Sequence, residues 1–487
     1  MDLDISISPL VTREFTAVVL AGFGAELIPL TSDYGDEPCP KALLPVANKP
    51  MIDYVFTWLE LSGIKDVVLI CPTVHRHAIS NHIHSETNVT LRIDLQTYDE
   101  IMDASVGTCS LLRHFAHRIQ SDFVVLPCDF LPPPSLSLTT ILNKFRSDRI
   151  SDGAIATTYW FVSNETEKAS EPDDWSPAFP PVAIVWDDKS GTLLHVDTAD
   201  DRDLNGEELE LRMSLLTLYP RTKVSTKYRD SHVYVCRRTV LDLLQEKPHV
   251  DSFREEFIPW LCKVPYQRTR REKYSHVLSP VTNAPTQSTA LLHSTLYDEP
   301  PLPSSNPKDS ASDEGRGSPT TSSLRVGIIL HREKEPAARL NTLHAYFEMN
   351  HRLVTPGVPA DRSLIDQKAQ VSADSMVGPS TQIGERTSVK RSVIGSHCVI
   401  GKMVKIVGCV LLDHCVVADG AKLDGCILGK NTKVGTKVEL SRCVTQAGYE
   451  VNAGESVKNE RLEISDWTGV LDEQEDSEET ESESEEE

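Results

Sequence analysis

The stretch from Val393 to Leu440 reads VIGSHCVIGKMVKIVGCVLLDHCVVADGAKLDGCILGKNTKVGTKVEL. Aliphatic residues recur in it at steps of six, six and five, so a block of three positions repeats every 17 residues. This spacing predicts a parallel β-helix whose coils are triangular, with one inward side chain on each flat face. The nine predicted core positions are Ile394, Ile400, Ile406, Leu411, Val417, Leu423, Leu428, Val434 and Leu440.

The same spacing extends in both directions and defines a region of about 370–460. One further block precedes the quoted stretch and another follows it, and fourteen of the fifteen positions are aliphatic. Each buried aliphatic side chain contributes about 1.5–3 kcal/mol of stabilising free energy, so the column of core positions is expected to hold this region together. The six added positions are Val377, Ile383, Val389, Thr445, Val451 and Val457.

Five of the eleven cysteines fall in this register. Each stands two residues before a core position. Three precede the first position of a coil, where the preceding coil carries Ser392, and Cys398 and Cys415 precede the middle position. Small, semi-apolar side chains suit such sites, and a free cysteine behaves as one. The sequence has no CxxC pair. We therefore interpret Cys398, Cys409, Cys415, Cys426 and Cys443 as structural residues, with metal binding as the weaker alternative.

The N-terminal half shows a different pattern, in which short apolar strands alternate with helices. That order predicts an α/β domain with a mostly parallel sheet. In such sheets the ligand crevice lies beyond the carboxyl ends of the strands, where the loop Gly22–Gly24 and Asp129 fall. The expected elements are a strand at Thr16–Ala21, a helix at Pro50–Ser62, a strand at Val67–Ile70, a helix at Leu111–Ile119 and a strand at Phe123–Leu126.

Composition divides the chain further. We expect an N-terminal arm over 1–14, the α/β domain over 15–355 and a disordered tail over 472–487. A segment rich in Pro, Ser, Asp and Gly predicts a disordered insertion within the α/β domain, at about 275–323. Order is expected to return with a strand at Val326–Leu330. A helix follows, with Leu343, Tyr346, Phe347 and Asn350 on one face and Asn341 or Thr342 as its cap.

The net charge of −23 is concentrated at one end of the chain. Eleven of these charges lie in 472–487, which has no basic residue, so the rest of the chain carries −12. The tail is either a solubilising segment or a docking segment for a basic partner. The acidic balance disfavours direct binding to nucleic acid. The one concentrated basic cluster, Arg268–Lys273, is either a solvated face or a contact for an acidic partner or RNA.

Hydropathy and the N-terminus indicate where the protein resides. No apolar run approaches the roughly 20 residues of a membrane span. The first residues, MDLDISISPLVTREF, carry acids and no apolar core of a signal peptide. We therefore expect a cytosolic protein that does not contact a membrane.

The densest motif is Val18–Val46, VVLAGFGAELIPLTSDYGDEPCPKALLPV, followed by NKPMI. A strand, a glycine loop and downstream lysines can cradle phosphates. The whole string resembles the signature of the nucleoside-diphosphate-sugar pyrophosphorylases, and Gly107-Thr108 and Asp129 extend the match. The resemblance implies a nucleotidyltransferase-like, Rossmann-like mixed sheet, a left-handed β-helix behind it, and a metal-binding role for the aspartate at position 129.

The motif also departs from that family. Ala25-Glu26 replace the family's Thr-Arg, so a carboxylate stands where an arginine would contact the triphosphate. Each such charge is worth about 3 kcal/mol at about 5 Å and an effective dielectric near 20. Ser32–Glu37 lengthens the loop with acids, and no counterpart of the second metal aspartate is found near 251–260, DSFREEFIPW. We therefore expect no catalytic residue, metal ligand or cofactor, and a degenerate nucleotide pocket of Gly22, Gly24, Glu26, Lys41, Gly107 and Asp129.

Further strings resemble one branch, the gamma subunits of eukaryotic translation initiation factor 2B. They are LRMSLL at 211–216 with Tyr219-Pro220-Arg221, DSHVYV at 230–235, and ARLNT at 338–342. The resemblance implies a non-catalytic subunit that pairs with the epsilon subunit. The pair would join alpha, beta and delta subunits in an assembly that exchanges GDP for GTP on initiation factor 2. Only some 15 residues separate Val457 from the acidic tail, so we expect no helical exchange domain there.

Two alternatives stay open. The chain is instead an active sugar-nucleotide pyrophosphorylase of the GDP-mannose type, if Glu26 and the acidic loop are harmless. A third hypothesis, compatible with the subunit role, is that the pocket binds a nucleotide without chemistry, since Gly22, Gly24, Lys41 and Asp129 persist.

Overall fold

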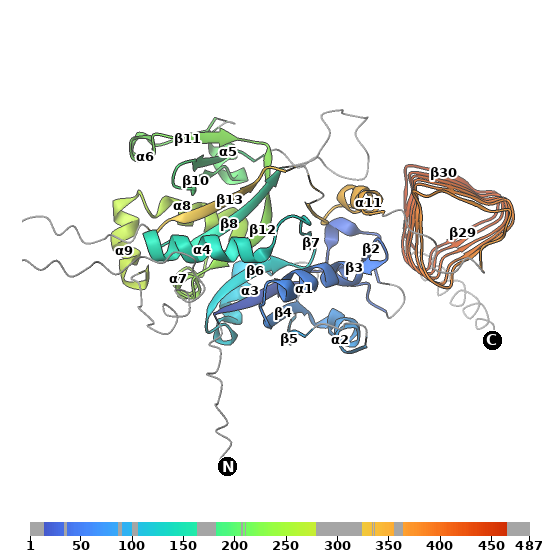
Figure 1. Cartoon of the computed structure of the whole chain (residues 1–487), viewed down its shortest axis with the longest axis horizontal. Coiled ribbons are helices and arrows are strands. Elements are labelled where there is room, and N and C mark those ends of the chain that lie inside the picture. Colours follow the sequence, from blue (N-terminus) through green and yellow to red (C-terminus); the bar gives the residue numbers. More distant parts are fainter. Residues whose placement is uncertain are drawn as a thin grey trace, which may run out of the picture. The chain divides into compact units, whose positions relative to one another are not determined.

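The computed structural model contains two compact units (Figure 1). The first comprises the described residues up to Gly22 and those from Met51 to Leu340. The second comprises Phe23–Pro50 and the described residues from Asn341 onward. Residues 1–13, the acidic tail and most of the expected insertion lie outside the described residues. The described ranges are 14–33, 37–85, 90–99, 106–162, 182–205, 208–209, 211–278, 324–333, 335, 337–354 and 364–464.

A ten-stranded mixed sheet forms the centre of the first unit. In spatial order, its strands are β11 (Thr222–Ser225), β9 (Ile184–Asp187), β10 (Thr192–Val196), β13 (Val326–His331), β8 (Ala156–Val162), β12 (Tyr228–Cys236), β6 (Asp122–Pro127), β1 (Phe15–Leu20), β4 (Asp66–Pro72) and β5 (Arg92–Tyr98).

The parallel part of the sheet is smaller than predicted. Strands β6, β1, β4 and β5 are parallel, as is the pair β8 and β13. The pairs that join β12 to β6 and β8, β10 to β9 and β13, and β11 to β9 are antiparallel. The mixed sheet that the resemblance implies is confirmed, while the expectation of a mostly parallel sheet from the strand–helix pattern was wrong. That pattern breaks down after β8, since β9 and β10 follow each other without a helix between them.

Helices α1 and α4 contact each other, while α7 contacts both α3 and α9. In Figure 1, α4 runs in front of the strands β8, β12 and β13 that it contacts. The predicted buried face of α1 is confirmed, since Ile52, Val55, Phe56 and Leu59 have no solvent exposure. The helices of this unit are α1 (Met51–Leu61), α2 (Arg76–Ser85), α3 (Thr108–His114), α4 (Leu138–Asp152), α5 (Ala199–Asn205), α6 (Met213–Leu218), α7 (Thr239–Gln245), α8 (Ile258–Lys263) and α9 (Arg268–Leu278).

Both predicted ends of one helix were wrong. The helix expected at Leu111–Ile119 begins at Thr108 and ends at His114, and a separate 3₁₀ turn covers Ala116–Arg118. Helix α9 ends at Leu278, near the approximate start of the expected insertion, whose extent stays a prediction. Propensity alone fixes such ends poorly, because tertiary contacts decide where a helix stops.

The second unit contains the β-helix, and Figure 1 looks along it so that its coils superimpose as a triangle. Parallel pairs join residues 17 positions apart, such as Ile394 with Leu411, which confirms the predicted repeat. The first sheet is β15 (Gln370–Val371), β18 (Ser388–Lys390), β21 (Lys405–Val407), β24 (Lys422–Asp424), β27 (Glu439–Ser441) and β30 (Ser456–Lys458). The second is β16 (Met376–Val377), β19 (Val393–Ile394), β22 (Val410–Leu411), β25 (Ile427–Leu428), β28 (Val444–Thr445) and β31 (Arg461–Leu462). The third is β17 (Gln382–Ile383), β20 (Val399–Ile400), β23 (Val416–Val417), β26 (Lys433–Val434) and β29 (Glu450–Val451).

The interior of the β-helix is closely filled. None of the nine side chains from Ile394 to Leu440 that we named as core is more than 3% exposed. The one non-aliphatic position, Thr445, is also buried, and its hydroxyl accepts a hydrogen bond from the Gly429 amide and contacts the Thr432 hydroxyl. A polar side chain is tolerated there because its hydrogen bonds are made inside the core.

The cysteines of the β-helix repeat the hydrogen bonding of serine. Ser392 Oγ donates to the carbonyl two residues earlier. Cys409, Cys426 and Cys443 donate from Sγ to the carbonyl at the same offset, over 3.2–3.4 Å. All five cysteines are buried. This bonding supports the structural interpretation.

Two short elements complete the second unit. The strands β2 (Pro45–Val46) and β3 (Lys49–Pro50) form a hairpin. Helix α11 (Leu343–Arg352) is capped by Thr342, whose hydroxyl accepts from the Ala345 amide, so Thr342 is the cap of the two that the sequence allowed. Within the described ranges, no helix is both long and apolar enough to cross a membrane.

Candidate functional site

Asp129 lies at the edge where the parallel strands of the first unit end. Strand β1 pairs with β6 through Leu20 and Pro127, and the Cys128 amide donates to the Leu20 carbonyl. Gly22 follows the end of β1 and Asp129 follows the end of β6. Asp129 is only 1% exposed. A carboxylate buried this deeply needs a partner that balances its charge.

That partner is Arg339. Its Nε donates to Asp129 Oδ1 over 3.2 Å and a terminal nitrogen donates to Oδ2 over 3.0 Å, so the guanidinium engages both carboxylate oxygens. The backbone fixes this pairing. Strand β14 (Ala338–Arg339) pairs with β7 (Phe130–Leu131), and the Leu340 amide donates to the Asp129 carbonyl. Two-point pairing of this kind is among the strongest and most directional contacts a carboxylate makes.

His232 continues the cluster on the other side of Arg339. The guanidinium lies 2.8–2.9 Å from the two imidazole nitrogens, and because an arginine only donates, a ring nitrogen is the acceptor. His232 has a φ of +58° where the register of β12 shifts between Asp230 and Tyr234. A non-glycine residue in this region costs energy, and it persists here because both neighbours are tightly bound.

Asp230 and Tyr234 form the buried base of the cluster. The Tyr234 hydroxyl donates to Asp230 Oδ2 over 2.5 Å, and the His232 amide donates to Oδ1 over 2.9 Å. Burial raises the pKa of the Asp230 carboxyl, and the charge of Arg254 and these hydrogen bonds oppose the rise. The cluster is thus a chain of polar groups whose bonds are made to one another.

Gly107 and its neighbours are bound to the segment at 251–260. Gly107 is the N-cap residue just before α3, and a Cβ atom there would lie 2.5 Å from the Asp251 carbonyl oxygen. The Cys109 amide donates to that carbonyl, and the Ser110 hydroxyl donates to the Asp251 carboxylate over 2.7 Å. Glycine is therefore required here for close backbone packing. Asp251 serves to hold α3.

The glycine loop itself belongs to the second unit from Phe23 onward. Gly24 has a φ of +85°, and a Cβ atom there would lie 2.9 Å from the Lys41 side chain, which crosses the loop and is buried. Glu26 is exposed. Solvent around Glu26 screens its charge, so its effect on a phosphate is smaller than the sequence-based figure. The inserted residue Asp36 lies outside the described residues.

The rest of this loop is hydrogen-bonded to α11 and the β-helix. The Asn48 side-chain amide donates to the Ile394 carbonyl over 2.9 Å, and the Gln446 amide donates to the Asp33 carbonyl over 2.9 Å. The Tyr346 hydroxyl donates to the Pro45 carbonyl, while Asn350 Oδ1 accepts from the Ala47 amide. Burial raises the pKa of Tyr346, which stays a neutral donor. These hydrogen bonds hold the loop within the second unit.

The six residues named from the sequence therefore separate into two sets. Gly22, Gly107 and Asp129 lie in the first unit, and Gly24, Glu26 and Lys41 lie in the second. Sequence reasoning missed Arg339, His232 and Asp230, although it singled out the strings that contain them. Arg339 lies 210 residues after Asp129 in the sequence, and no sequence signal indicates that the two side chains form a pair.

Comparisons with known proteins agree with this architecture. A nucleotidyl transferase family model matches residues 16–168, and a model described as the EIF2B subunit epsilon LbH domain matches residues 360–457. The abbreviation LbH denotes a left-handed β-helix. The chain is thus a nucleotidyltransferase homologue with a left-handed β-helix.

Three curated relatives narrow the class. The translation initiation factor eIF2B subunit gamma of Schizosaccharomyces pombe is 32% identical over 77% of this chain and 74% of its own length. The subunits of the same name from Caenorhabditis elegans and Dictyostelium discoideum are 27% and 21% identical. These matches cover 51% and 74% of this chain, and 58% and 82% of the relatives. The chain belongs to the family of eIF2B gamma subunits.

Proposed function

We propose that this chain is a non-catalytic subunit of the eIF2B guanine-nucleotide exchange complex. The observation that carries the proposal is the pairing of Asp129 with Arg339. In the resemblance to the pyrophosphorylases, Asp129 takes the place of a metal-binding aspartate. A covalently attached guanidinium occupies both carboxylate oxygens. Magnesium needs such an oxygen, together with further oxygen ligands from protein, phosphate or water.

The pairing matters because nucleotidyl transfer needs a metal ion at the phosphates. Transfer between phosphates depends on a metal that neutralises charge developing on the phosphate oxygens. Arg339 already neutralises Asp129, and its side chain is held by His232 and by the β14–β7 pair. Displacing it would leave a buried cation without its partner, which costs several kcal/mol. In this proposal the nucleotidyltransferase fold is retained, and the Asp129 carboxylate serves to bind Arg339 and not a metal ion.

The role we propose depends on partners. The chain pairs with the epsilon subunit, joins alpha, beta and delta subunits, and assists GDP/GTP exchange on initiation factor 2 in the cytosol. The gamma-subunit relatives support this assignment by name. The way the glycine loop is bonded to α11 and the β-helix supports a structural use of the former phosphate loop.

Copurification tests the proposal. The full-length chain, tagged at its native locus, is isolated from its own cells at moderate ionic strength, with an untagged strain as the control. We expect an epsilon-like chain in stoichiometric amount, together with the remaining subunits. Recovery of the chain as homo-oligomers alone would contradict the assignment.

A further inference from the structure

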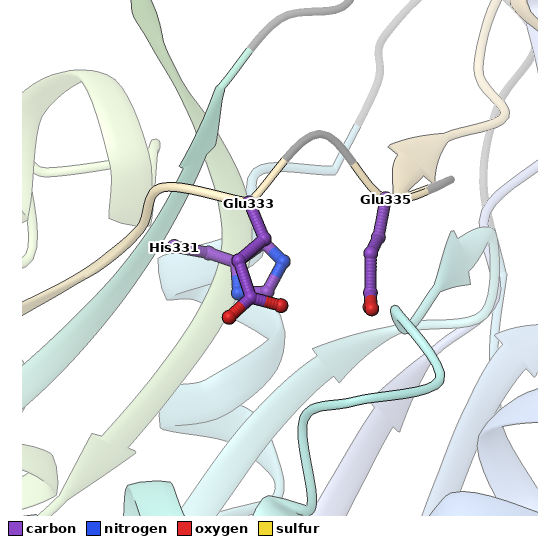
Figure 2. Close-up of side chains that lie close together, drawn as sticks. All are labelled: His331, Glu333 and Glu335. Atoms are coloured by element: carbon purple, nitrogen blue, oxygen red, sulfur yellow. The ribbon is translucent and has the colours of Figure 1, made fainter.

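A second polar cluster lies in the first unit, on the segment that joins β13 to β14. His331 ends β13, and Glu333 and Glu335 follow at alternate positions. Figure 2 shows the Glu333 and Glu335 side chains extending in the same direction, with the His331 ring beside Glu333. One ligand atom from each lies within 4.8 Å of the other two.

One nitrogen of the buried His331 imidazole has no hydrogen-bond partner among the described residues. The residue is 9% exposed, and the nitrogen concerned is Nε2. Tyr159, whose ring centroid lies 6.3 Å from that of His331, is fully buried, and its hydroxyl likewise has no partner in the described ranges. Leaving a buried polar atom unsatisfied costs about 1–3 kcal/mol. Two such atoms at one place indicate that this site is built to receive something.

Glu335 is held in position by a neighbour. The Ser135 hydroxyl and the Ser135 amide both donate to Glu335 Oε2, over 2.6 and 3.1 Å. The hydrogen bond from the Ser135 hydroxyl lowers the pKa of this carboxyl. Carboxylates and imidazoles that bind metals are commonly oriented by such outer contacts.

We propose that His331, Glu333 and Glu335 form a binding site for Zn²⁺. One imidazole and two carboxylates are ligands that zinc accepts, at bond lengths of about 2.0–2.2 Å, with water completing the coordination. The ion balances two carboxylate charges and satisfies the buried imidazole. The Tyr159 hydroxyl supplies a donor or acceptor beside the cluster. Magnesium is disfavoured because imidazole is a poor ligand for it.

The position of the site suggests its role. The segment that carries the three ligands leads directly to Arg339 in β14, and Glu335 also holds Ser135 beyond β7. A bound ion would fix this segment at its midpoint and so favour the placement of Arg339 on Asp129. None of the three ligands belongs to the Asp129 cluster, so each site can be substituted without removing a residue of the other.

Metal binding to the full-length chain tests the proposal. The protein is stripped with a chelator, dialysed and titrated with Zn²⁺ against a chromogenic competitor, with circular dichroism to verify folding. We expect Glu333→Gln and His331→Gln to bind one equivalent fewer than the parent chain. Glu333 is exposed, so its substitution leaves the fold intact. Glu255→Gln, the same change at an exposed carboxylate elsewhere, serves as the matched control and should bind as the parent does.

Two further readouts separate this site from zinc held by other residues. We expect Ser135→Ala to weaken binding by about tenfold to a hundredfold, because it removes the hydroxyl that orients Glu335. X-ray absorption of the zinc-loaded chain should show nitrogen and oxygen ligands at the equivalent that Glu333→Gln loses. Equal binding by the parent chain and Glu333→Gln would overturn the proposal. Sulfur ligation at that equivalent, or binding of Mg²⁺ in preference to Zn²⁺, would also overturn it.

Discussion

The β-helix and the nucleotidyltransferase-like region differ in what their sequence motifs predict about each residue. In the β-helix each repeated aliphatic residue still performs the role its position predicts, facing inward and packing on the coil before it. The motif residues of the α/β domain are used otherwise: Asp129 in the first unit binds Arg339, and Lys41 in the second unit packs across Gly24. A motif residue is therefore strong evidence for packing in a repeat and weak evidence for chemistry outside one, where the contacting side chain decides its role.

The largest effect is expected where the β-helix is regular. Val417→Asp places a charge in the core of β23 and should cost about 5 kcal/mol or more, because no partner there can balance it. Val416→Asp, one residue away and 41% exposed, is the matched control and should change stability by less than about 0.5 kcal/mol. Urea unfolding followed by circular dichroism measures both. Similar losses for the two variants would contradict the inward assignment.

The next largest effect is expected at the buried pair of Asp129 and Arg339. Arg339→Ala removes one partner of a buried pair and should destabilise the first unit by about 3–5 kcal/mol, since Asp129 is left charged and buried. Arg332→Ala, which removes an exposed arginine paired to Asp188, should cost no more than about 1 kcal/mol. Denaturant midpoints compare them.

A double variant sharpens the same test. Asp129→Asn combined with Arg339→Met removes both charges and should recover much of the stability that Arg339→Ala loses. Independent, additive losses would show that the two side chains do not act as a pair.

A smaller effect compares one histidine in each unit, the buried His195 and the half-buried His351. Burial lowers the pKa of His195 in β10, and the charge of Lys263 lowers it further while Asp201 opposes. Burial also lowers the pKa of His351 in α11. Because both take up a proton less readily when folded, their stabilisation is present above pH 6.5 and is lost as the pH falls through that value.

The histidine effect is isolated by substitution. Asp230, whose pKa burial raises, contributes with the opposite sign, so the parent chain alone does not separate the causes. Free energies of unfolding measured from pH 7.5 to 5.5 should fall less steeply for His195→Gln and His351→Gln than for the parent. Unchanged slopes in both variants would show that these histidines do not titrate with folding.

The repeat and core positions of the β-helix could be predicted almost completely from the sequence, because a 17-residue repeat is local and each coil pairs only with its neighbours. Sequence reasoning identified the parallel strands that begin the sheet and the buried face of α1, which also depend on local periodicity. It missed the antiparallel half of the sheet, where β12 pairs with both β6 and β8. That pairing joins segments some hundred residues apart, and no local pattern specifies it.

The same limit explains the candidate site. Asp129, Gly22 and Gly107 could be named because they lie in or near recognised motifs. Arg339 could not, since its effect depends on the β14–β7 pair, which brings two dipeptides together across more than 200 residues. The role of Asp251 was also hidden, because its backbone carbonyl, which carries no sequence signal, makes the contact with α3.

The most direct test of the central claim, that Arg339 has taken the metal site of Asp129, is an assay of pyrophosphate release. The purified full-length chain is incubated with magnesium, each nucleoside triphosphate and a set of sugar 1-phosphates, beside Asp129→Ala and a blank without protein. We predict that the parent chain and Asp129→Ala both give the background rate. Robust turnover by the parent chain that Asp129→Ala abolishes would contradict the account and show an active pyrophosphorylase.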